Sequence, residues 1–185
     1  MILLFHEMDH YNLWYDILNY FDFGTHLSFV FTCKLINHIY PINNLCDINK
    51  KYLSKFDDYT LRFFNPVKLK IIIEKIRDIS HMHRLKILEI DGSSYIDSEI
   101  LRKLDLVELH LNNNYIISNL SGMKNLKVLH ISGSVSAINQ SSIWGLNLVE
   151  LKLMETYNIT DVSFMKNLKI LYACGTGGIS GMKHF

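Results

Sequence analysis

The sequence of 185 residues has few residues that break or cross-link a chain, with 2 proline, 9 glycine and 3 cysteine residues. Cys33, Cys46 and Cys174 are odd in number and far apart, which excludes a disulfide framework and the paired spacing of a zinc knuckle. Lysine and arginine number 19 and aspartate and glutamate 18. A chain with so little net charge lacks the basic face that neutralises phosphates, so we expect no nucleic-acid partner.

Long apolar runs are also missing. No stretch approaches the roughly 18 apolar residues that cross a membrane, and we expect no membrane partner. The first residues, Met1 to Glu7, lack the positively charged region and the longer apolar stretch of a secretory signal. Unpaired thiols suit a reducing compartment, so the expected location is the cytoplasm.

Leucine and isoleucine are abundant, at 26 and 23 residues, and many of them recur at a fixed spacing. A phrase of the form LxxLxL, with Ile or Ala allowed at the last position, starts at Leu85, Leu106, Leu126, Leu148 and Leu168, at intervals of 20 to 22 residues. This pattern resembles the leucine-rich repeat, in which stacked repeats each add one short strand to a parallel sheet. We therefore expect an α/β solenoid, a short-repeat leucine-rich-repeat array of about five repeats over residues 85–185, with parallel strands on its concave face.

Each repeat should leave its strand through a turn and then cover the core again. The repeat is too short for full α-helices on the convex side, so 3₁₀ or extended segments are expected there. Polar residues that could satisfy backbone groups in the turns are Asn114, Ser93, Ser134, Thr156 and Thr176. The apolar residues expected to close the convex side are Ile96, Ile116, Ile138, Ile159 and Ile179.

The leucines themselves belong to the core, so a binding function must lie between them on the concave face. The partner-binding residues expected there are Glu89, Glu108, His110, Val128, His130, Glu150, Lys152, Met154, Ile170 and Tyr172. Such a mixture of charged, apolar and aromatic side chains suits protein recognition, and the alternative is a solvated face without a partner. His110 and His130 should be neighbours about 5 Å apart, but they lack a third ligand, so we expect neither a metal nor a cofactor.

The first 45 residues carry a different, helical pattern. Leu13 is followed by Ile17-Leu18-Asn19-Tyr20-Phe21-Asp22, and a second apolar stretch runs Phe29-Val30-Phe31-Thr32-Cys33-Lys34. In this order, residues 1–45 resemble the F-box, a helical module that opens many leucine-rich-repeat proteins. The Leu-Pro pair that usually starts an F-box would fall at Asp9-His10 and is missing.

The resemblance implies a substrate-recognition subunit of a ubiquitin ligase of the Skp1–cullin–F-box type. A Skp1-like adaptor would contact Leu13, Ile17, Leu18, Phe21 and Phe29, while the repeats hold an unknown protein substrate; such a chain is not an enzyme. The alternative is a stand-alone leucine-rich-repeat binding or decoy protein that does not dock a ligase. Pairings of this kind are common in giant viruses of amoebae and in slime-mould-like protists, and a viral chain would act in the host cytoplasm.

Residues 46–84 are expected to be a helical connector and N-terminal cap. Apolar residues from Val67 to Ile79 recur at helical spacing after Asn65-Pro66, which predicts an amphipathic helix over about 66–79 that covers the first repeat. The stretch from Asp47 to Phe64 fits either a divergent repeat or a helix with a loop.

Two further patterns bear on function. His6-Glu7-Met8-Asp9-His10 matches HExxH, so a zinc hydrolase is a remote alternative. Near the other end, Ile179 to Phe185 repeats the lead-in Leu120 to Leu126. The last repeat is therefore expected to be poorly capped, and a homodimer through it is possible.

Overall fold

The computed structural model describes residues 44–45, 56–62, 64–72, 75–92, 94–134, 136–176 and 178–180. The chain divides into two compact units, Met1–Tyr40 and Pro41–Phe185, and all the described residues belong to the second. The expected F-box-like module at 1–45 therefore lies outside the described residues, except for residues 44 and 45.

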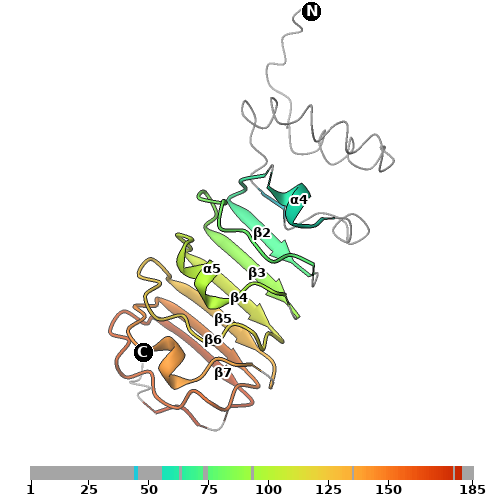
Figure 1. Ribbon diagram of the computed structural model, residues 1–185. Coiled ribbons are helices and arrows are strands. Elements are labelled where there is room, and N and C mark those ends of the chain that lie inside the picture. Colours follow the sequence, from blue (N-terminus) through green and yellow to red (C-terminus); the bar gives the residue numbers. More distant parts are fainter. Residues whose placement is uncertain are drawn as a thin grey trace, which may run out of the picture. The chain divides into compact units, whose positions relative to one another are not determined.

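The second unit is a parallel-strand β-solenoid of about six turns (Figure 1). Every strand pairs in parallel with the next strand along the chain, so the sheet order is the sequence order. The seven strands are β1 (Asn44–Leu45), β2 (Lys68–Ile71), β3 (Ile87–Asp91), β4 (Glu108–Asn112), β5 (Val128–Ser132), β6 (Glu150–Met154) and β7 (Ile170–Cys174). The last five strands are those that the repeated phrase predicts.

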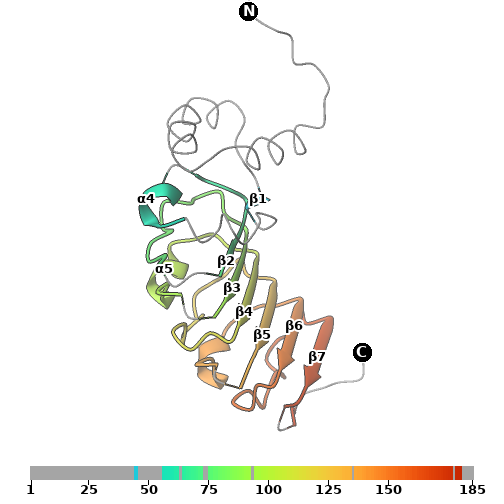
Figure 2. The ribbon, with the colours of Figure 1, turned by 90° about the vertical axis from the view of Figure 1, so that its right-hand side faces the viewer.

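Only short helices occur in the described segments that return from one strand to the next. They are α4 (Asp58–Leu61), α5 (Ser98–Arg102) and the 3₁₀ helix η1 (Gln140–Ile143), and Figure 2 shows α4 and α5 on one side of the sheet. Each is capped by a preceding side chain; Asp97, for example, accepts the Ile100 N–H at 2.9 Å. A period of about twenty residues leaves room for a strand, two turns and one helical turn, as expected.

The core is a single layer between the sheet and these returning segments. In β3, Leu88 and Ile90 are fully buried while the residues that alternate with them are not, because successive strand side chains point to opposite faces. On the returning side Ile96, Ile138, Ile159 and Ile179 are buried as expected. In the remaining repeat the expected Ile116 is only half-buried, and its neighbour Ile117 takes the core position, eight residues after Leu109.

The helix expected over 66–79 is wrong. Residues 68–71 form strand β2 instead, which pairs with β3, and the described residues 75–79 are not helical. The four residues Lys68-Leu69-Lys70-Ile71 alternate between polar and apolar, and Leu69 and Ile71 are buried against the core. This segment is so rich in isoleucine that its apolar residues fit both the spacing of a helix and the alternation of a strand. Pairing with the edge of β3 favours the strand.

The repeat array consequently begins before residue 85. Both β1 and β2 are part of the same sheet, so the sheet extends through the region expected to be a separate helical cap. Within the ambiguous stretch from Asp47 to Phe64, the described residues contain the single-turn helix α4, whose Asp57 and Thr60 cap each other. Strands β1 and β2 therefore extend the sheet on the N-terminal side of the five predicted repeats.

A row of left-handed residues follows strands β3 to β7. Their φ angles are positive, at Gly92 (84°), Asn113 (51°), Gly133 (103°), Glu155 (56°) and Gly175 (64°). The N–H of each of the first four donates to a carbonyl at the end of the next strand, at 2.8 to 3.0 Å. Gly133 has a φ of 103°, and a Cβ there would lie 2.3 Å from Asn113 Oδ1 and 3.1 Å from the Asn113 Cα, so a larger residue would be strained at this position.

Candidate functional site

The outward side chains of strands β3 to β7 form what we call the ladder face. They stand in three rows, because the parallel register aligns each strand with the next without a shift. All ten expected partner-binding residues lie on it: Glu89, Glu108, His110, Val128, His130, Glu150, Lys152, Met154, Ile170 and Tyr172. The spacing thus predicted their location, and their binding role stays a prediction.

Two stacked histidines occupy the middle of the ladder face. His110 and His130 are register partners, and their ring centroids are 4.2 Å apart with 31° between the ring planes. Each ring also contacts a carboxylate: His110 Nε2 lies 2.7 Å from Glu108 Oε1, and His130 Nε2 lies 2.9 Å from Glu150 Oε1. The four side chains form one polar cluster across β4, β5 and β6.

Burial and neighbouring charges shift the pKa values of His130 and Glu150. Desolvation lowers the pKa of His130 below the ordinary histidine value, and the hydrogen bond to Glu150 offsets this only in part. Lys152 Nζ, 2.7 Å from Glu150 Oε1, and then His130 lower the pKa of Glu150. At neutral pH His130 is therefore a neutral ring beside the Glu150 carboxylate, which also pairs with Lys152.

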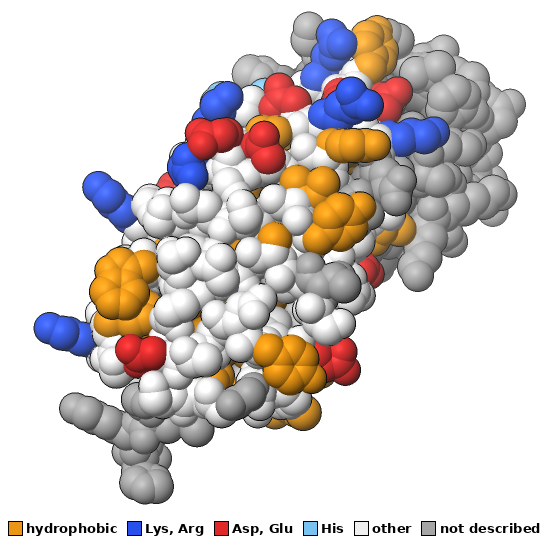
Figure 3. Space-filling model, turned by 60° about the horizontal axis from the view of Figure 1, so that its bottom comes forward, with side chains coloured by type: hydrophobic (Ala, Val, Ile, Leu, Met, Phe, Trp, Pro, Cys, Tyr) orange, Lys and Arg blue, Asp and Glu red, His pale blue; other side chains and the backbone are white. Residues whose placement is uncertain are grey.

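The N-terminal side of the ladder face carries Glu89, whose charge is paired with a lysine on the preceding strand β2. Lys70 on β2 forms an ion pair with Glu89 on β3, and both side chains are only about a quarter exposed, at 28% and 25%. Figure 3 views the molecule from below the view of Figure 1 and so shows another side than the ladder face; there, charged side chains crowd the upper part of the view, while the rest of the visible surface is mostly uncharged. A partner gains little from charges that already neutralise each other.

The C-terminal side of the ladder face is apolar and open. Met154 is 45% exposed, Ile170 50% and Tyr172 49%. These three side chains come from the adjacent strands β6 and β7, and Tyr172 is the register partner of Lys152. We call this group, Met154, Ile170 and Tyr172, the apolar end. It combines large exposed side chains with the Lys152–Glu150 ion pair at its border.

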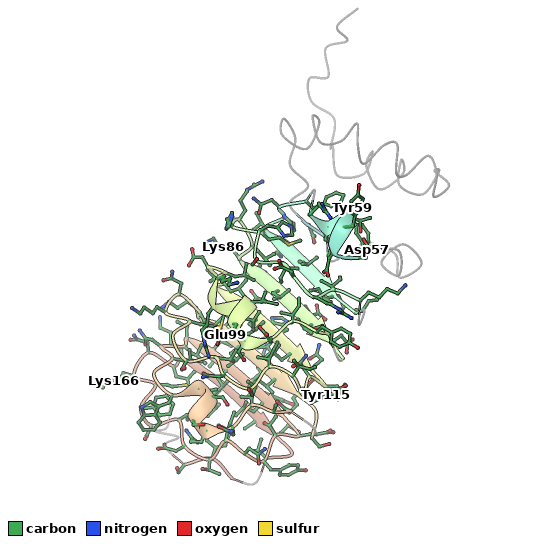
Figure 4. The ribbon with its side chains drawn as sticks, viewed as in Figure 1. Asp57, Tyr59, Lys86, Glu99, Tyr115 and Lys166 are labelled. Atoms are coloured by element: carbon green, nitrogen blue, oxygen red, sulfur yellow. The ribbon has the colours of Figure 1, made fainter. Side chains whose placement is uncertain are left out.

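The sequence reasoning missed other exposed aromatic residues outside the ladder face. Tyr95, Tyr115 and Tyr157 are each more than half exposed and lie in the turns after β3, β4 and β6. In Figure 4 Tyr115 lies on the opposite side of the stack from Lys166. On the side of Lys166, Trp144 stacks on Phe164, with ring centroids 4.8 Å apart. These two rings and Lys166 line a shallow hollow of about 400 Å³.

The turn residues expected to bond backbone groups do so unevenly. The buried Asn114 donates from Nδ2 to the Gly92 carbonyl at 3.1 Å and accepts the N–H groups of Ile116 and Ile117 at 3.2 and 2.9 Å. Thr156, at the matching position, is buried, and its hydroxyl has no hydrogen-bond partner among the described residues. Ser134 is exposed and Thr176 is half-buried, while Ser93 lies outside the described residues.

Some expected features cannot be placed in this geometry. The HExxH stretch at 6–10 and the adaptor-docking residues Leu13, Ile17, Leu18, Phe21 and Phe29 lie outside the described residues. Within the described part of the chain, no three or more His, Cys, Asp or Glu side chains are grouped as a metal site. The same residues contain no helix of the length and apolar character needed to cross a membrane.

The fold and the ladder face together define a class, the parallel-strand solenoid repeat proteins, whose surface is built from aligned rows of side chains. No family model, no curated protein and no solved structure matches the chain.

Proposed function

We propose that this chain is a leucine-rich-repeat protein that binds a partner protein on its ladder face. The observation that carries the proposal is the apolar end, where three large side chains are about half exposed on two adjacent strands. Exposed tyrosine and methionine beside a charged border are typical of protein interfaces, where a few such residues supply most of the binding energy.

The layout of the ladder face suggests where the partner gains affinity. A partner that covers Met154, Ile170 and Tyr172 removes apolar surface from water without breaking an ion pair. Lys152 and Glu150 at the border then select a partner with matching charges. The net charge of +1 suits such a mixed protein surface better than a phosphate backbone.

In its finer form the proposal is that of a substrate-recognition subunit of a Skp1–cullin–F-box type ubiquitin ligase. It is supported by the F-box-like order of residues 1–45 and by the repeat array that follows them. The chain would then perform no covalent chemistry. It would hold the substrate close to the ubiquitin-carrying enzyme, so that a bimolecular transfer becomes effectively local.

Binding on the ladder face can be tested by affinity capture with the full chain and by titration of the captured protein. Tyr172→Ala and Lys152→Glu should each weaken binding by about tenfold or more, which corresponds to about 1.4 kcal/mol at a central contact. Tyr157→Ala is the matched control, because Tyr157 is 58% exposed but lies off the ladder face. Equal effects of Tyr172→Ala and Tyr157→Ala on affinity would contradict the proposed face.

Ligase docking has a separate test. The full chain should retain a purified Skp1-like adaptor, and Ile17→Asp combined with Phe21→Asp should abolish retention. Tyr172→Ala serves as the control, since it alters the ladder face and should leave adaptor binding unchanged. No adaptor binding by the wild-type chain would favour a stand-alone binding or decoy protein.

A further inference from the structure

Strand β7 has one edge that no described strand covers. On its inner edge the Ile170 N–H donates to the Val149 carbonyl at 3.1 Å, and the Cys174 carbonyl accepts the Glu155 N–H at 2.8 Å. Backbone groups alternate in direction along a strand. Ile170, Tyr172 and Cys174 therefore point their N–H and C=O groups toward β6, while Leu171 and Ala173 point theirs away from it.

The side chains of β7 are also incompletely covered. In β3 to β6 the two inward positions are buried, whereas in β7 Leu171 is half-buried and Ala173 is exposed. The strand reads Ile-Leu-Tyr-Ala-Cys and contains no charged residue. Lysine, aspartate or glutamate occurs in β2, β3, β4 and β6, and the uncharged β5 is paired on both of its edges. Natural edge strands usually carry charge or proline, so an uncharged edge that no described strand covers is expected to be paired.

We infer that two copies of this chain pair through their β7 strands, antiparallel, about a two-fold axis that passes beside Tyr172. In that register Leu171 of one copy faces Ala173 of the other, and the same pair occurs again on the far side of the axis. Leu171 and Ala173 are the residues with outward N–H and C=O groups, so each pair can exchange two hydrogen bonds. The outward N–H and C=O groups of one β7 strand can therefore all hydrogen-bond to those of a second copy of β7.

The side chains fit the same arrangement. On the core side, the larger Leu171 lies opposite the smaller Ala173, and on the ladder face Ile170 lies opposite Cys174. The two Tyr172 rings lie next to each other across the axis, in a position where aromatic cross-strand pairs stabilise a sheet. With no charged residue on the strand, the pairing brings no like charges together.

The pairing would join two seven-stranded sheets edge to edge. A two-fold axis perpendicular to the sheet leaves both ladder faces on the same side. The inference rests on the backbone and composition of β7, and it holds whether or not the ladder face binds a partner protein.

The first test is the mass of the purified full chain in solution. Light scattering should give twice the 21.6 kDa of one chain at micromolar concentration. Ala173→Pro removes an outward N–H without touching the bonds to β6, and it should abolish the dimer. Ala173→Ser, which keeps the N–H, should leave the dimer intact. A wild-type monomer, or a dimer that Ala173→Pro does not weaken, would overturn the inference.

The second test fixes the register by cross-linking and does not depend on the proline variant. Tyr172→Cys, with Cys33, Cys46 and Cys174 replaced by serine, should form an intermolecular disulfide on mild oxidation. Paired Cα atoms at the axis lie about 4.5 Å apart, within reach of a disulfide. A second variant that keeps Tyr172 and Cys174 and has only Cys33 and Cys46 replaced by serine should not cross-link, because four residues of offset place the two copies of the Cys174 Cα about 14 Å apart. A Cys174 cross-link without a Tyr172→Cys cross-link would refute this register.

Discussion

Asn114 should be one of the most sensitive polar positions of the solenoid. Its side chain is buried and makes three hydrogen bonds to backbone groups: one to Gly92 in the preceding turn and two within its own turn, to Ile116 and Ile117. Asn114→Ala removes all three at once. The substitution leaves two N–H groups after β4 and one carbonyl after β3 without this partner.

The size of the effect follows from those three bonds. A buried backbone group that loses its partner costs about 1–3 kcal/mol, and the smaller figure applies where water can reach the turn. Asn114→Ala should therefore lower the free energy of unfolding by about 3 kcal/mol. For a chain of this size that corresponds to a fall in Tm of roughly 6–12 °C.

Circular dichroism during heating and in urea measures both quantities. Asn167→Ala is the control, because Asn167 is exposed and bonds only another side chain, and its effect should stay within about 0.5 kcal/mol. The reverse experiment is Thr156→Asn, which should raise the free energy of unfolding by about 1–2 kcal/mol, since the buried threonine hydroxyl has no partner among the described residues. If Asn114→Ala were as mild as Asn167→Ala, the turn would not depend on this side chain.

The remaining predictions concern the core, the backbone and pH. Leu129 is fully buried, so Leu129→Ala should lower the free energy of unfolding, measured in urea, by about 2–5 kcal/mol. Tyr172→Ala should lower it far less when measured on the monomeric chain. Equal losses from the two substitutions would disprove the assignment of faces. Glu155→Gly should raise Tm, because the left-handed strain of about 1–2 kcal/mol exceeds the entropy cost of glycine, and a lower Tm would contradict this. Because the pKa of folded His130 is lowered, the unfolded chain takes up its proton first, and stability should fall as pH drops below about 6.5. The Glu150 pKa is lowered as well, so its contribution should be lost as pH drops below about 4.5. Stability measured from pH 7 to 5 should decline less in His130→Gln than in the wild type, and identical profiles would exclude His130 as the source.

The sequence was sufficient to predict strands β3 to β7 and their alignment, because both follow from one period. A leucine that recurs every 20 to 22 residues places each strand beside the next, and alternation then decides which side chains face outward. The neighbouring histidines, His110 and His130, were found in this way. The period also predicted that the convex segments would be too short for full helices.

The remaining features depend on context that the pattern does not contain. The strand β2 was missed because Leu69 and Ile71 also fit a helical stripe with Ile72, Ile76 and Ile79. The left-handed row was missed because a glutamate, Glu155, occupies one of its five positions and hides the recurring Gly and Asn. Exposure within the ladder face is not contained in the period either: Tyr172 on β7 is 49% exposed, although it occupies the same row as the half-buried His110 and His130.

Strand order that follows sequence order has a consequence for how such a protein can change. Each turn contacts the turns before and after it, so duplication or loss of one whole turn would leave two compatible neighbours in contact. Replacement of a single turn would exchange three outward side chains and leave the other rows in place. A molecule built this way can alter its ladder face in discrete steps, by recombination between repeats as well as by point substitution.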